Sequence, residues 1–82
     1  SELILFPNPT NGQFFLNGKL KENQDIRIEV RNILGQMIFE KELNQAFEIQ
    51  ESIELDDAPS GNYFVSIRME NRAVYSEKIV KN

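Results

Sequence analysis

Three carboxylates near residue 55 come nearest to a reactive or metal-binding cluster in this sequence. Glu54, Asp56 and Asp57 directly precede the turn-forming segment 58–61. A carboxylate pair can act as general acid and base, and carboxylate oxygens are ligands that calcium prefers. Calcium loops, however, need several oxygen ligands at alternating spacings, and hydrolytic carboxylates need a walled cleft. We therefore interpret the aspartates as the polar entry to a turn, and we expect no catalytic and no metal site.

The composition removes most other catalytic groups. The 82 residues include no cysteine and no histidine. Thiol nucleophiles, imidazole bases, disulfides and zinc sites built on Cys or His are thereby excluded. The four glycines stand alone, without a phosphate-binding motif. We therefore expect a protein that is not an enzyme and needs no cofactor.

The charge narrows the range of partners. A net charge of −4 argues against a nucleic-acid binder, which needs clustered Lys and Arg for phosphate contacts. No apolar run approaches the roughly 18 residues of a membrane span, so we expect no membrane insertion. Residues 1–67 have five basic and eleven acidic side chains, whereas residues 68–82 have four and two. This basic end is typical of a protected edge strand, and it could also steer an acidic partner.

Alternation with a period of two predicts an all-β fold. Ile26, Ile28 and Val30 share one face of a strand, and charged residues occupy the other. We expect strands at residues 2–6, 13–17, 25–32, 36–43, 47–55, 61–70 and 73–80. Asn17-Gly18 is typical of a hairpin, and the polar segment 19–24 of a loop that crosses between sheets. The sequence thus predicts one domain over residues 1–82, a seven-stranded antiparallel immunoglobulin-like β-sandwich.

Three positions leave alternatives open. Glu51 breaks the apolar row of its stretch, which predicts an interruption or a sheet edge there. Phe64 lies opposite the apolar row of residues 63, 65 and 67, so it is either covered or displayed as a docking contact. In the final stretch Val74 and Ile79 have opposite parity, which indicates either a bulge or a strand contacted on both faces.

Four motifs follow one another along almost the whole chain. They are Pro7-x-Pro9-x-x-Gly12, Ile28-x-Val30-x-Asn32-x-Leu34-Gly35-Gln36, Leu55-x-x-Ala58-Pro59-Ser60-Gly61-x-Tyr63-x-Val65 and Lys78-Ile79-Val80-Lys81. In this order they resemble the C-terminal sorting domain of the type IX secretion system, the Por secretion system family. The resemblance implies a signal that directs a cargo protein across the outer membrane of a Bacteroidetes-type bacterium.

The resemblance also implies partners and recognition residues. The partners would be the outer-membrane translocon and its shuttle protein, a sortase-like cysteine peptidase, and a cargo domain on the N-terminal side. The protein would pass through the periplasm and reach the cell surface or the medium, released or attached after cleavage. Weak self-association through an edge strand stays open. The recognition candidates are Pro7, Pro9, Gly12, Gly35, Gly61, Tyr63, Val65, Lys78, Ile79, Val80, Lys81 and Asn82.

Two further expectations concern the extent of the chain and the way it is read. A start at Ser1 rather than Met suggests a domain excised from a larger secreted protein. A receptor could read a strand edge or the terminal segment through backbone hydrogen bonds. The alternative is an immunoglobulin-like accessory or adhesive module that binds glycan or protein, but two tyrosines and no tryptophan offer few stacking residues.

Overall fold

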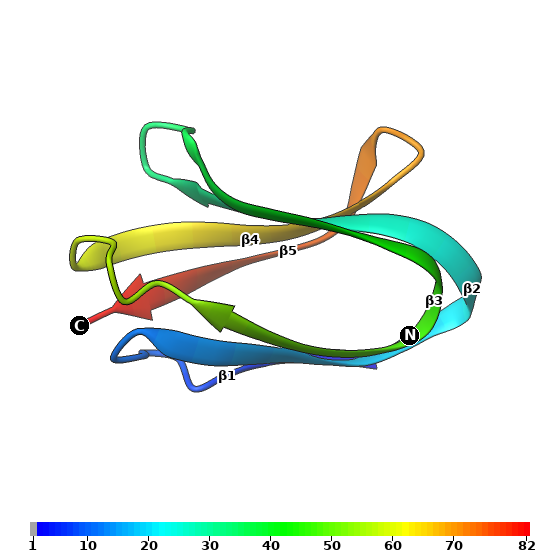
Figure 1. Ribbon diagram of the computed structural model, residues 1–82, viewed down its shortest axis with the longest axis horizontal. Coiled ribbons are helices and arrows are strands. Elements are labelled where there is room, and N and C mark those ends of the chain that lie inside the picture. Colours follow the sequence, from blue (N-terminus) through cyan, green and yellow to red (C-terminus); the bar gives the residue numbers. More distant parts are fainter. Residues whose placement is uncertain (1) are drawn as a thin grey trace.

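The chain folds into strands joined by turns. The structure is a computed structural model that describes residues 2–82, so Ser1 of the expected domain lies outside the described residues. Its strands are β1 (Glu2–Phe6), β2 (Gln13–Asn32), β3 (Met37–Glu54), β4 (Gly61–Met69) and β5 (Arg72–Lys81). All of their pairings are antiparallel, which confirms the all-β class (Figure 1). Over residues 2–82 there is no helix long and apolar enough to cross a membrane.

The structure has five strands where seven were expected. The stretches 13–17 and 25–32 belong to the two halves of β2, and the stretches 36–43 and 47–55 belong, except for residues 36 and 55, to one strand, β3. The expected crossing loop 19–24 is wrong, because β2 continues through it as a bend with shifts in register. β3 bends beside it, with Gln45 at a φ of 52°. The immunoglobulin-like detail is not confirmed.

The bends fold one sheet into two facing layers. One layer contains β1 and the first half of β2, and the other contains the second half of β2 with β4 and β5 (Figure 1). Among the described residues, β3 pairs only with β2 and forms one edge of each layer. The expected inner rows of β2 and β4 are buried, and they meet Phe14, Leu16, Ile49 and Ile53 of the opposite layer in one core. Apolar burial of this kind is the main stabilising term of so small a domain.

Gly18 corrects the expected hairpin at Asn17-Gly18. The glycine lies inside β2, where it pairs with Leu3 of β1. A Cβ atom at this position would stand 1.9 Å from the Glu2 carbonyl oxygen. The glycine therefore serves the close approach of β1 and not a turn.

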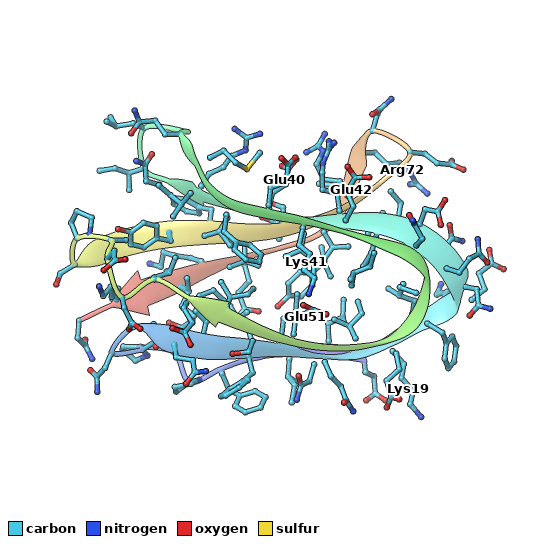
Figure 2. The ribbon with its side chains drawn as sticks, in the orientation of Figure 1. Lys19, Glu40, Lys41, Glu42, Glu51 and Arg72 are labelled. Atoms are coloured by element: carbon cyan, nitrogen blue, oxygen red, sulfur yellow. The ribbon has the colours of Figure 1, made fainter. Side chains whose placement is uncertain are left out.

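The three open positions are now resolved. Of the two alternatives for Glu51, the sheet edge is confirmed, because β3 continues through this residue as an edge strand. The Glu51 carboxylate accepts a hydrogen bond of 2.9 Å from the Lys41 ammonium across the open side of the two layers (Figure 2). Phe64 is 40% exposed and therefore displayed. Phe47 is also exposed, although the alternation along its strand predicts it on the same inner row as the buried Ile49 and Ile53. The mixed parity of the last strand reflects an irregular register between β4 and β5, where Arg68 pairs with Ala73.

Candidate functional site

The proline-rich opening motif lies against the end of the chain. The side-chain amide of Asn8 makes two hydrogen bonds to β5. Its Nδ2 donates to the Lys78 carbonyl (2.8 Å), and its Oδ1 accepts from the Val80 backbone amide (3.0 Å). The buried Thr10 continues the contact, because its amide donates to the Val80 carbonyl and its carbonyl accepts from the Asn82 amide. Thr10 and Lys81 thus form a short parallel bridge. We call residues 8–10 with residues 78–82 the terminal latch.

Lys81 fastens the turn after β3 to the same place. Only 9% of the residue is exposed, and its ammonium donates to the backbone carbonyls of Leu55 (2.7 Å), Asp56 (3.1 Å) and Ala58. These three acceptors satisfy the donors of a buried ammonium group, which would otherwise be costly to remove from water. The last basic residue of the terminal motif therefore acts inside the fold.

Gly12 and Tyr63 complete the junction around residues 55–61. The Gly12 carbonyl accepts from the Leu55 amide at 2.7 Å. Gly12 has a φ of 148°, and a Cβ there would stand 2.1 Å from an Asp56 carboxylate oxygen. The Tyr63 hydroxyl, at the other side of the turn, donates to the Pro59 carbonyl. The first, third and fourth motifs therefore meet in one hydrogen-bonded junction.

The second motif forms a hydrogen-bonded hairpin tip between β2 and β3. The Asn32 Oδ1 accepts from the amides of Leu34 and Gln36, each at 3.0 Å, and the Asn32 carbonyl accepts from the Gly35 amide. The Arg31 guanidinium donates to the Gly35 carbonyl at 2.9 Å. The tip lies at the end of the molecule that holds the C-terminus (Figure 1), beside the turn that leads into β4. All four motifs therefore gather at one end.

The recognition candidates divide into exposed and buried residues. Ile79 and Val65 are fully buried, and Tyr63 and Lys81 nearly so; Gly12 is also buried. Val80 is half-buried. The exposed candidates are Pro7, Pro9, Gly35, Gly61, Lys78 and Asn82. A partner that binds the folded domain can contact only the exposed set and part of Val80, so the buried candidates contribute by holding the structure.

The backbone of the terminal segment is occupied on both sides. β4 pairs with residues 78–81 along one edge, and Asn8 and Thr10 bond to the other. Recognition of this segment through free backbone groups would require the latch to open. Sequence reasoning missed Asn8 and Thr10; a polar residue after each of two prolines was the only signal.

The outer face of the second layer contains a compact ion network. The Glu29 carboxylate, only 4% exposed, contacts the guanidinium groups of Arg27 (2.9 Å) and Arg31 (3.5 Å). Arg27 also reaches Glu40 at 3.3 Å. Phe64 lies next to this network, paired with Arg31. The network neutralises a carboxylate that the neighbouring side chains have removed from water.

The carboxylates near residue 55 lie where β3 ends and the following turn begins. Glu54 and Asp56 are exposed, and a hydrogen bond between the two side chains, with the negative charge of Asp56, raises the pKa of Glu54. Within residues 2–82, no three acidic side chains are arranged to hold a metal ion. The acidic group is an open surface feature beside the junction.

The fold and the junction define a small β-domain whose motif residues serve to build one end of the molecule. Residues 4–82 match the family described as the secretion system C-terminal sorting domain, and the chain belongs to this family. A comparison with curated proteins gave no significant match. The protein is therefore a C-terminal sorting signal of type IX secretion, which implies interaction with that machinery and export to the cell surface or the extracellular space.

Proposed function

We propose that the motif-bearing end of this domain is the part that the type IX machinery reads, and that a cargo precedes the domain. The gathering of all four motifs at the end away from the start of β1 supports this proposal (Figure 1). A cargo attached before β1 would then lie opposite the end that is presented. The domain would be one unit of a larger secreted protein.

Membership of the family supports a proposal for the partners. We infer that an outer-membrane translocon and its shuttle protein bind the domain after it has crossed the periplasm. A sortase-like cysteine peptidase then removes it, and the cargo is released or attached to the surface. Because the latch occupies the backbone of residues 78–82, the side chains of Lys78, Val80 and Asn82 are the candidates for direct contact with a partner.

The test is a fusion of the chain to the C-terminus of a signal-bearing fluorescent reporter. The fusion is expressed in a type IX-competent bacterium and in its translocon-deficient twin, and the periplasm, surface and medium are compared. We expect reporter outside the cell only where the translocon is present. Retention of the folded fusion in the periplasm of both strains would contradict the proposal and favour an accessory-module role.

A further inference from the structure

The hairpin tip displays two large apolar side chains that no other described residue covers. Leu34 is 78% exposed and Ile33 is 71% exposed, the highest values among the large apolar residues of the described chain. The Asn32 hydrogen bonds fix this turn, so the two side chains project from a preformed support. A preformed apolar projection loses little freedom on binding, and it is therefore suited to entering a partner's surface.

A groove runs from this tip along the turn before β4. One hollow of about 280 Å³ lies between the hairpin tip and residues 59–63. A second hollow adjoins it beside residues 54–58, and the two share Ile38 and Pro59 as walls. Lys81 and Tyr63 hold the backbone of these walls through their bonds to residues 55–59. We call the two hollows the tip groove.

The charge of the tip groove selects the partner. Glu54, Asp56 and Asp57 line one hollow, and neither hollow is lined by Lys or Arg. Lys81 directs its ammonium to three backbone carbonyls of this wall. The Arg31 guanidinium beside the tip donates to the Gly35 carbonyl and contacts Glu29, so it is also engaged. An anionic lipid surface would be repelled by the three carboxylates, whereas a cationic protein segment would be attracted.

We propose that the tip groove binds a protein segment in which an apolar residue lies next to lysine or arginine. The apolar side chain packs against Leu34 and Ile38, and the basic side chain pairs with the carboxylates at residues 54–57. This inference deepens the proposed function and rests on it in one respect, that the partner belongs to the export route. Binding of such a segment by the isolated chain does not depend on that route.

The first experiment tests binding in solution. The ¹⁵N-labelled 82-residue chain is titrated with an acetylated peptide of alternating lysine and leucine, with its glutamate–leucine counterpart, and with phosphatidylglycerol vesicles. We expect amide shifts confined to residues 32–38 and 54–63, with the lysine peptide alone. No shifts, equal shifts with the glutamate peptide, or binding to the vesicles would overturn the proposal.

Asp57→Lys adds a charge test within the same titration. We expect about tenfold weaker binding of the lysine peptide, while Glu48→Lys, an equal charge change on an exposed residue of β3 outside the groove, leaves binding unchanged. If both variants lose the same affinity for the lysine peptide, the peptide is attracted to the acidic protein in general, and the proposal of a specific site is wrong.

The second experiment tests whether the tip groove is needed for export. The double variant Ile33→Ser/Leu34→Ser is fused to the reporter and compared with Ile4→Ser, which removes an apolar residue that is 60% exposed on β1. We expect about tenfold less export for the double variant, with unchanged melting temperatures for both. Normal export of the double variant would overturn the role of the groove. Failure of the unmodified fusion to leave the cell would instead refute the proposed function.

Discussion

At the scale of single residues, a variant of Lys81 can show whether this lysine stabilises the fold or is recognised by a partner. Lys81→Met keeps the apolar stem but removes the ammonium donor from three carbonyls. The Leu55 carbonyl still accepts from the Ala58 amide, so the carbonyls of Asp56 and Ala58 lose the most. Charged hydrogen bonds and orphaned buried acceptors each contribute on the order of 1–3 kcal/mol, so we expect the free energy of unfolding to fall by about 2–4 kcal/mol. Urea denaturation of the isolated chain measures it.

Lys78→Met is the matched control, because it makes the same chemical change three residues earlier on an exposed side chain. We expect its effect to stay within about 0.5 kcal/mol. Equal stability of the two variants would refute the buried role of Lys81. Lost export with normal stability in Lys78→Met would identify Lys78 as a contact residue.

Tyr75 gives the domain a pH dependence in the alkaline range. Partial burial, followed by the hydrogen bond to Glu77 and the charge of Glu77, raises the pKa of Tyr75 above its ordinary value. Below about pH 10 the phenol is neutral in both states, so its contribution to stability is complete. At higher pH the unfolded chain ionises first, and stability falls as pH rises toward the folded-state pKa.

The expected result is a steeper loss of stability above about pH 10 for the natural chain than for Tyr75→Phe. Urea midpoints on both sides of that pH measure it. Lysines titrate in the same pH range, so the effect of Tyr75 is the difference in stability loss between the natural chain and Tyr75→Phe. Equal loss of stability in the two chains would contradict the assignment to Tyr75.

The sequence predicts on which face of a strand a side chain lies better than it predicts which residue that side chain contacts. The buried rows at residues 26–30 and 63–67 follow from their period of two, because a strand sends alternate residues to opposite faces. The same rule cannot predict that Lys81 caps carbonyls 23 to 26 residues earlier, or that Glu51 finds Lys41. Those contacts depend on how the layers fold over, which no local pattern specifies.

At the scale of elements, the terminal latch should behave as a local unit. Asn8→Ala removes two hydrogen bonds to β5 but no core contact. We expect the Val80 amide to exchange about tenfold faster with solvent, while global stability falls by about 1 kcal/mol. Hydrogen exchange followed by NMR measures both quantities.

Asn11→Ala serves as the control for the latch, since Asn11 makes a single exposed side-chain bond, to Asn82. We expect unchanged exchange at Val80 in this variant. If Asn8→Ala also leaves Val80 protected, β4 alone holds the end of β5, and the latch has no energetic role.

The bounds of β2 and β3 could not be predicted from the sequence. The seven expected stretches fall within the observed strands except for single residues at three of their ends. The polar segments 19–24 and 44–46, which separate expected strands, are also part of β2 and β3. A long hairpin can bend through polar residues when both of its strands bend together, as β2 and β3 do around Gln24 and Ala46. Pairing between strands, rather than the polarity of either one, decides whether the chain continues as a strand.

At the scale of the whole molecule, the folded sheet separates two ends with different tasks. β1 begins at the end opposite the C-terminus, whereas the motifs and the tip groove share the other end (Figure 1). Burial of Ile79 ties β5 into the common core. Deleting residues 74–82 would therefore unfold the domain as well as remove a signal, and point variants are the better probes of recognition.

Because the two ends differ in this way, we expect export to tolerate added residues at the start of the domain but not after its last residue. About ten glycine and serine residues placed between the reporter and residue 1 lie away from the motif end, and the same insert after Asn82 lies beside the latch. Both chains should melt at the same temperature, because Asn82 is exposed and flexible linkers add little to the core. We expect export to fall about tenfold only for the chain extended after Asn82. Equal export of both, measured as reporter outside the cell against the translocon-deficient twin, would contradict recognition at this end.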